Sequence, residues 1–446
     1  MSGELLVQRI ESVDPTTLLA LHGAFPERYP AFFESAGTST SDCYDILFAC
    51  PGERLVARVG ESAANFLSLL DARWRAERVE RGDPKLPFRG GWLLFFAYDF
   101  AQYVEPTLNL PQGTLPIAEA IRVPVAIVRD RRSNWSWVVA ESSAAECVRT
   151  IGEDLANVAL DAAGCGAVME GEVEEEPSDR YIQSVTRALE YIAAGDIYQA
   201  NLSREWRALL QSNATAVDLF RRLRRTNPGP FSGIAALTER SIVTSSPERL
   251  VRVRDGWAET RPIAGTRPRG ADASADLELA RELRAHPKEQ AEHVMLIDLE
   301  RNDLGRICDA GTVSVDEFMT IETYAHVHHI VSNVRGKLRE GTSPGQVIQA
   351  VFPGGTITGC PKVRCMEIIG ELEGVPRGAY TGSLGYLNRD GSMDLNILIR
   401  TLEVVGRDIT LRAGAGIVAD SIPERELHET RAKARGLLHA LTDAAN

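Results

Sequence analysis

A short acidic stretch divides this chain of 446 residues and restricts its organisation more than any other feature. The sequence GEVEEEP follows a segment rich in glycine and alanine, and the break in composition covers residues 164–177. Neighbouring carboxylates repel one another and are best solvated by water, so we expect an exposed linker here. It would separate an N-terminal region, residues 1–163, from a second region, residues 178–446.

Both regions contain patterns typical of strands and helices. Strands are predicted where β-branched, aromatic and other apolar residues cluster, at residues 120–128, 135–139, 241–245 and 250–253. Apolar residues recur on one helical face after Ser178 or Asp179, either of which can cap the helix, and this pattern ends near Gly195. Two more helices are predicted after Pro287 and in ERELHETRAKARGLLHAL near the C-terminus. The chain is therefore expected to mix α and β structure.

Charge and cysteine content exclude several classes of protein. A formal net charge of -13 disfavours a nucleic-acid binder, which needs a basic face. The seven cysteines are scattered and include no C-x-x-C pair, which disfavours disulfide frameworks and structural zinc. We find neither an export signal nor an apolar run long enough to span a bilayer. The expectation is a cytoplasmic protein with no nucleic-acid or membrane partner.

Two pairs of glutamates occur within the predicted helices. Glu289 and Glu292 are three residues apart, as are Glu426 and Glu429, and residues with that spacing share a helix face. Four carboxylates brought together would repel one another unless a hard cation such as Mg²⁺ lay between them. Taken alone, the spacing is more typical of solvated surface glutamates, so it does not establish a metal site.

Glycine-rich and basic segments could recognise an anion. Residues 353–359 and 412–420 contain glycines that let backbone N–H groups approach a ligand, although such segments also serve as plain turns. Three basic residues could pair with a ligand carboxylate: Lys362, Arg400 and Lys433. The cluster of Tyr324, His326, His328 and His329 resembles a metal site, but alternation along a strand places at most two histidines on one face. Zinc is therefore not predicted.

Seven motifs, in order, are similar to those of the chorismate-utilising enzymes. This family includes anthranilate synthase component I, aminodeoxychorismate synthase component I, isochorismate synthase and salicylate synthase. The resemblance extends from residue 179 to the end. The motifs are GDIYQANLS, SSPERL, RPIAGTRPRG, EHVMLIDLERNDLGR, GGTITGCPKVRCMEII, RGAYTGSLGY and AGAGIVADSIPERELHETRAKA.

The resemblance implies a large α/β fold, of the α+β kind, in which two sheets form a sandwich surrounded by helices. It also implies Mg²⁺, bound directly by Glu292 and Glu429 and through water by Glu289 and Glu426, and neutralising a carboxylate of chorismate. Glu248 matches the acid that protonates the departing C4 hydroxyl. The other expected catalytic residues are Gln199, His329 and Lys433, and the expected substrate-binding residues are Gly265, Thr266, Thr356, Tyr380, Arg400 and Gly416.

Two positions narrow the expected reaction. The position of Gln199 resembles one that is a lysine base in family members that add water to chorismate. A neutral amide cannot deprotonate water, so the resemblance implies amination instead. Ala264 stands where well-known aminodeoxychorismate synthases have a nucleophilic lysine, and alanine is the anthranilate synthase form. YQANLS and NPGPFSG look like the aminodeoxychorismate group instead, and the LLES-type segment of anthranilate synthases is altered here to FFESAGTS.

We therefore expect amination of chorismate at C4, with anthranilate synthesis as the alternative and a non-catalytic chorismate-binding regulator as an alternative of another class. The sequence contains no glutamine-amidotransferase cysteine motif. Ammonia is accordingly expected from solution or from a separate glutaminase subunit.

Overall fold

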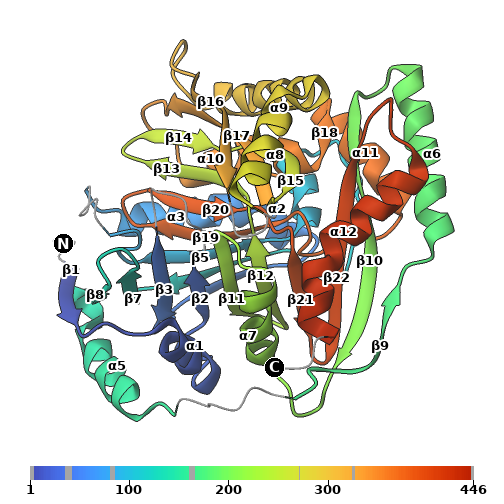
Figure 1. Ribbon diagram of the computed structural model, residues 1–446. Coiled ribbons are helices and arrows are strands. Elements are labelled where there is room, and N and C mark those ends of the chain that lie inside the picture. Colours follow the sequence, from blue (N-terminus) through green and yellow to red (C-terminus); the bar gives the residue numbers. More distant parts are fainter. Residues whose placement is uncertain are drawn as a thin grey trace.

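Two large antiparallel sheets form the framework of the computed structural model, which describes residues 5–35, 43–80, 86–159, 166–270, 272–323 and 327–442 (Figure 1). In these residues one sheet has twelve strands and the other has ten. The first runs β1 (Leu5–Ile10), β8 (Trp135–Glu141), β7 (Val125–Asp130), β3 (Tyr44–Ala49), β2 (Ala31–Glu34), β11 (Phe231–Leu237), β12 (Arg240–Ser246), β21 (Thr401–Val405), β22 (Asp408–Ile417), β10 (Gln199–Leu210) and β18 (Gly359–Cys360), with β9 (Met169–Glu175) also on β10.

The second sheet contains both N-terminal and C-terminal strands. It runs β15 (Ile263–Pro268), β17 (Val327–Lys337), β14 (Trp257–Thr260), β13 (Arg249–Arg254), β20 (Met393–Asn396), β19 (Ser383–Asn388), β5 (Gly91–Phe96), β6 (Ala118–Val123) and β4 (Arg54–Ala57), with β16 (Ser314–Thr323) also on β17. One apolar core includes Phe48 and Ile242 from the twelve-stranded sheet and Phe96 and Val251 from the ten-stranded sheet. The predicted two-sheet α/β architecture is confirmed.

Helices cover the outer faces and ends of the two sheets (Figure 1). α7 and α12 contact strands of the twelve-stranded sheet and share a second apolar core with it, whereas α8 and α9 contact β15 and β17. The helices are α1 (Pro15–Ala24), α2 (Glu61–Ala64), α3 (Phe66–Glu77), α4 (Ala101–Val104), α5 (Ala145–Asn157), α6 (Ser178–Ala194), α7 (Ala216–Thr226), α8 (Ala273–Ala285), α9 (Pro287–Gly305), α10 (Pro344–Val351), α11 (Lys362–Glu373) and α12 (Pro423–Thr442), with short 3₁₀ turns η1 (Tyr98–Phe100), η2 (Ser142–Ala144) and η3 (Gly355–Ile357). In the described residues no helix is both long enough and apolar enough to cross a membrane.

The predicted helices at α6, α9 and α12 are confirmed, with one correction. α6 ends at Gly195, whose φ of 82° suits the left-handed cap, but its N-cap is Pro177 and no side chain bonds to the cap position. Ser178 and Asp179 lie inside the first turn instead. The predicted strand at residues 120–128 is in fact two strands, β6 and β7, which belong to different sheets and are separated by Pro124. Proline has no N–H to donate to a neighbouring strand, so the chain leaves one sheet and enters the other at this residue.

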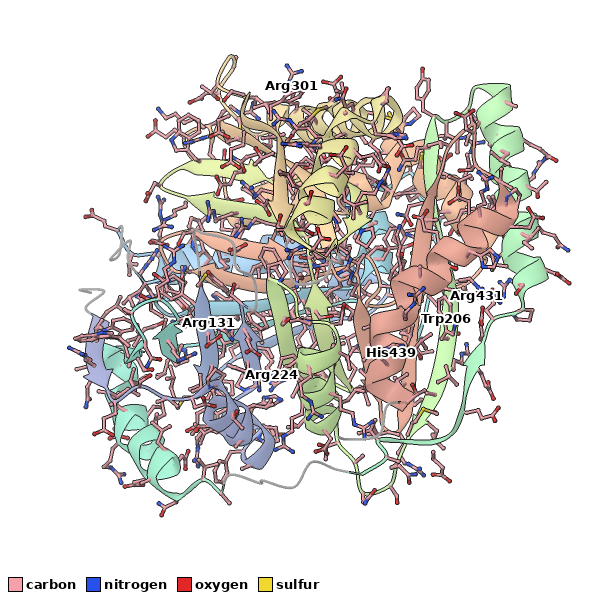
Figure 2. The ribbon with its side chains drawn as sticks, in the orientation of Figure 1. Arg131, Trp206, Arg224, Arg301, Arg431 and His439 are labelled. Atoms are coloured by element: carbon pink, nitrogen blue, oxygen red, sulfur yellow. The ribbon has the colours of Figure 1, made fainter. Side chains whose placement is uncertain are left out.

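The acidic stretch contains strand β9 (Met169–Glu175), antiparallel to β10. Most of its side chains are exposed, and Glu175 pairs with Arg204 of β10 and Arg431 of α12. Arginines on neighbouring elements thus offset the repulsion between its glutamates. The regions before and after this stretch share both sheets, and Glu34 of β2 joins them directly by pairing with Arg131 and Arg224 (Figure 2).

A buried ion-pair network joins α11 to β10 and β22. Glu373 accepts hydrogen bonds from the Ser203 N–H at 2.8 Å, from Arg377 at 2.7 Å and from Arg412 at 3.2 Å. Arg377 also donates to the Asn201 carbonyl at 2.6 Å. Burial alone would raise the pKa of Glu373, but the two guanidinium groups hold it below its ordinary value.

We predict that Arg377→Met lowers the free energy of unfolding by ~3–5 kcal/mol, because it leaves the Glu373 carboxylate buried with one cationic partner fewer. Denaturant unfolding followed by circular dichroism measures the change. Glu367→Gln, which breaks the exposed Arg364–Glu367 pair on the same helix, is the matched control and should change stability by less than about 0.5 kcal/mol. Equal effects of the two substitutions would contradict this account.

Candidate active site

Glu248 is a buried carboxyl group in the turn between β12 and β13. Its Oε1 accepts a hydrogen bond from the Thr356 hydroxyl at 2.7 Å, and its backbone carbonyl accepts from the Ile397 N–H at 3.0 Å. Burial raises its pKa to about 7, while Thr356, the Ile263 backbone and the charges of Lys433 and Arg400 oppose the rise. A carboxyl group with this pKa can be protonated near neutral pH and can act as a general acid.

Two predicted basic residues act on Glu248. Arg400 is partly buried, has a φ of 51°, and follows the Ile397 segment that holds the Glu248 turn. Burial lowers the pKa of its guanidinium and the Glu248 charge raises it. Lys433 donates to the Gly414 carbonyl at 3.0 Å and pairs with Glu429 at 2.8 Å. Both cations therefore lie close enough to Glu248 to attract an anionic ligand bound beside it.

Two glycines of β22 lie against the side chains of Gln199, at the start of β10, and of Tyr380. A β-carbon at Gly416 would lie 2.8 Å from the Gln199 side-chain nitrogen, and one at Gly414 would lie 2.7 Å from the Tyr380 hydroxyl. Glycine at these two positions lets both polar side chains lie directly against the strand. Burial raises the pKa of Tyr380 to about 12, so its hydroxyl stays protonated at neutral pH.

His329 joins β17 to β15 at the other predicted pocket positions. Its Nδ1 lies 3.0 Å from the Thr266 hydroxyl and 3.3 Å from the Gly265 carbonyl oxygen. Burial and the charge of Arg400 together lower the pKa of His329 to about 4. The imidazole is therefore neutral near pH 7 and can take part in hydrogen bonding without carrying charge.

The neighbouring histidine has other partners. His328 contacts Asp276 at 2.8 Å and Thr323 at 2.9 Å, which accounts for both of its ring nitrogens. Tyr324 and His326 lie outside the described residues. Among the described residues, His328 and His329 project from successive positions of one strand, so they do not share a face.

The four glutamates predicted to bind metal lie on α9 and α12. Glu289 pairs with Arg267 at 3.2 Å and lies beside Gly265, where a β-carbon would be 2.9 Å from its Oε2; Glu429 pairs with Lys433. In the part of the chain that the structure describes, no three acidic, histidine or cysteine side chains are arranged to hold a metal ion. The donors are nevertheless of the type that Mg²⁺ prefers, and it commonly uses only one or two protein carboxylates. Their chemistry fits the ion, and the ligand set stays a prediction.

Lys362, Asp303 and Glu300 make interactions that the sequence did not predict. Lys362, expected to pair with a ligand carboxylate, instead donates to Asp303 of α9 at 2.7 Å and to the Val351 carbonyl oxygen at 3.3 Å. Glu300, one turn before Asp303, is buried, and burial together with the Asp303 charge raises its pKa to about 8. The sequence did contain a sign of this pair, because Glu300 and Asp303 repeat on α9 the three-residue spacing of Glu289 and Glu292.

A cavity of about 960 Å³ lies elsewhere, between N-terminal and C-terminal segments. It is lined by residues such as Phe33, Tyr44 and Trp74 and by Arg249 and Asp394. None of the predicted catalytic, substrate-binding or metal residues lines it. The candidate active site is therefore identified by the chemistry around Glu248.

We predict that Glu248→Gln stabilises the fold relative to wild type as pH rises. The folded-state pKa is about 7, above the ordinary 4.5, so the stability that protonated Glu248 contributes is complete at low pH and is lost as pH rises through about 7. Glutamine does not ionise, so the difference should grow to about 3 kcal/mol and then level off. Denaturant unfolding at a series of pH values measures it, with Glu367→Gln as the exposed control. A difference that does not vary with pH would refute the assignment.

Comparison with known proteins identifies the family of this chain. The family model described as chorismate binding enzyme matches residues 29–439. An anthranilate synthase component I-like protein of Synechocystis is 42% identical over 80% of this chain and 73% of its own length. Aminodeoxychorismate synthase component 1 of Bacillus subtilis is 40% identical over 79% of this chain and 77% of its own length.

The fold is also shared with a solved structure. Anthranilate synthase component I from Streptococcus pneumoniae superposes with a TM-score of 0.79 at 29% identity, covering 90% of this chain and 93% of that one. The resemblance inferred from the seven motifs is confirmed, and the chain belongs to the family of chorismate-binding enzymes.

Proposed function

We propose that this enzyme aminates chorismate at C4 and forms 4-amino-4-deoxychorismate, the precursor of 4-aminobenzoate in cytoplasmic folate biosynthesis. The observation that carries the proposal is the buried Glu248 carboxyl, bonded to Thr356 and influenced by Arg400 and Lys433. Protonated Glu248 donates to the C4 hydroxyl as the C4–O bond breaks, and water leaves. The ammonia lone pair forms the C4–N bond, and the resulting ammonium returns a proton to Glu248.

Binding and orientation come from the residues around this acid. Arg400 and Tyr380 would receive the enolpyruvyl carboxylate, Gly416 would offer backbone contact, and Lys433 would add positive charge. Neutral His329, with Thr266, Gly265 and Thr356, would complete the pocket as hydrogen-bonding groups. Gln199 is buried at the start of β10 and cannot deprotonate water, which favours amination over hydration.

Glu292 and Glu429 would hold Mg²⁺ directly, and Glu289 and Glu426 would do so through water. The ion would neutralise the ring carboxylate of chorismate and so assist its binding in an acidic protein. Glu429 would have to exchange its present partner, Lys433, for the ion. That exchange would also leave the Lys433 ammonium available to the substrate.

Anthranilate synthesis is the second candidate, and one residue favours it. Ala264 on β15 lacks the amine that a covalent C2 intermediate needs. Relatives with both names are about equally similar: the Bacillus aminodeoxychorismate synthase is 40% identical and the Thermus thermophilus anthranilate synthase component 1 is 43% identical. YQANLS and NPGPFSG favour C4 amination by a route without a lysine adduct.

Product identification tests the proposal. The purified chain, supplied with chorismate, Mg²⁺ and ammonium, is expected to form aminodeoxychorismate, detected by chromatography and by its conversion to 4-aminobenzoate when a lyase is added. Glutamine should replace ammonium only when a separate glutaminase subunit is present. Anthranilate as the main product would establish the second candidate, and binding of chorismate without turnover would establish a non-catalytic regulator.

Metal dependence tests the carboxylate set. Glu429→Ala should raise the Mg²⁺ concentration needed for half-maximal chorismate turnover by about tenfold or more, since a direct ligand is removed. Glu424→Ala, on the first turn of the same helix and outside the proposed set, is the matched control and should leave it unchanged. Full activity of the wild type in excess chelator would refute the metal site.

A further inference from the structure

Lys362 is a largely buried cation that closes the segment carrying Thr356. It is the first residue of α11, and its Nζ donates at 3.3 Å to the carbonyl oxygen of Val351, the last residue of α10. The ammonium therefore joins the two ends of residues 352–361, which include the η3 turn. Its side chain is 13% exposed, so water competes little for these bonds.

The same ammonium attaches the segment to α9. Its Nζ lies 2.7 Å from Oδ2 of Asp303, whose side chain is 5% exposed. α9 also contacts η3, and a β-carbon at Gly355 would lie 3.1 Å from Cβ of Leu299, four residues before Asp303. Residues four apart share a helix face, so the turn packs on the face of α9 that carries Asp303. Neither charge of this pair could stay buried without the other.

The other side of the segment is attached to β10 through Thr358. The Thr358 hydroxyl donates to the Gly354 carbonyl oxygen at 3.0 Å, and its own carbonyl accepts from the Asn201 N–H at 2.9 Å. Thr356 lies between the two attachments and donates its hydroxyl to Glu248 Oε1 at 2.7 Å. The position of that hydroxyl therefore depends on β10 on one side and on the buried ion pair on the other.

We propose that Lys362 is a positioning residue for catalysis, whose ion pair with Asp303 holds the η3 turn against α9 and so keeps the Thr356 hydroxyl on Glu248. The catalytic consequence rests on the proposed function, in which Glu248 is the acid. The hydrogen bond from Thr356 fixes the direction of the carboxyl group and stabilises the carboxylate that remains after the proton has moved to the departing hydroxyl. Lys362 needs no contact with the substrate for this role.

Other charges act on Glu248 as well. Arg400 and Lys433 favour its ionised form, and Glu248 also interacts with Glu300 of α9. These three residues are present in every variant below, and a comparison made with and without the Thr356 hydroxyl separates their influence from that of the hydrogen bond.

Carbon-13 NMR of the whole chain, labelled at glutamate carboxyl carbons, tests the positioning without turnover. The Glu248 signal is the one that Glu248→Gln removes. Donation from Thr356 favours the ionised carboxylate, so Thr356→Val should raise the pKa of Glu248 by about one unit. The double variant Asp303→Asn with Lys362→Met removes the ion pair without changing the net charge, strands no buried charge, and should raise that pKa by a similar amount.

Combining the substitutions separates positioning from charge. Added to Thr356→Val, the double variant should change the pKa of Glu248 little further, because the hydroxyl through which the pair acts is already gone. Lys362→Met alone gives the same comparison if the double variant does not fold. Arg364→Met removes an exposed cation of α11 and is the matched control, which should leave the pKa in place. A pKa that does not rise in the double variant, or that rises equally without the Thr356 hydroxyl, overturns the inference.

The pH dependence of turnover tests the catalytic role. Lys362→Met should lower kcat about tenfold and move its alkaline limb about one unit to higher pH, since a displaced acid with a raised pKa is weaker but stays protonated longer; KM for chorismate should stay near the wild-type value. Lys362→Arg keeps a cation that can donate to Asp303 and should restore the limb. A limb that stays in place or moves to lower pH contradicts the role. A wild type that does not consume chorismate overturns the proposed function, and the NMR comparison still decides the positioning.

Discussion

The arrangement of β10, β22 and α11 depends on the buried ion pairs of the Glu373 carboxylate. It is almost fully buried and is bonded by two arginines and by the backbone and hydroxyl of Ser203. A buried charge is tolerated only when its partners satisfy it, so the elements carrying these partners have little freedom to move apart. β10 carries Gln199, β22 carries Gly416, and Tyr380 follows Arg377 by three residues, with the guanidinium 5.6 Å from its ring. Each is a predicted site residue.

Burial also sets the chemistry of the site. The same loss of water raises the pKa of Glu248 and of Tyr380 and lowers that of His329, so all three favour their neutral forms. Neutral groups that can donate hydrogen bonds suit an acid and its pocket, while Arg400 and Lys433 supply positive charge. In a chain with a net charge of -13, this local balance would favour binding of a dianionic substrate such as chorismate at the proposed site.

The sequence predicted the helices well where a single pattern ran for several turns, as in α6, α9 and α12. It failed where tertiary pairing overrode the local pattern. Residues 120–128 read as one apolar strand, yet Pro124 divides it between two sheets, and the repulsion expected in the acidic stretch is relieved by Arg204 and Arg431 from distant elements. The motifs assigned Glu248 and Thr356 to one site, and in the structure these two side chains are hydrogen-bonded. Lys362 was expected to bind a ligand carboxylate. Its actual partner, Asp303, lies on another helix, and the sequence does not show that the two helices meet.

What the sequence by itself determined is the family and the mixed α/β character, since these reside in residue types and in their order along the chain; it also proposed the candidate reacting groups. Only the tertiary structure decided which of those groups are charged. Glu248, Glu300 and Asp303 have ordinary carboxyl groups as written in the sequence. In the fold, burial raises the pKa of each, opposed by the Thr356 hydrogen bond at Glu248 and by the charge of Lys362 at Glu300 and Asp303. Desolvation and charge coupling depend on distances between segments far apart in the chain, and no local pattern encodes those distances.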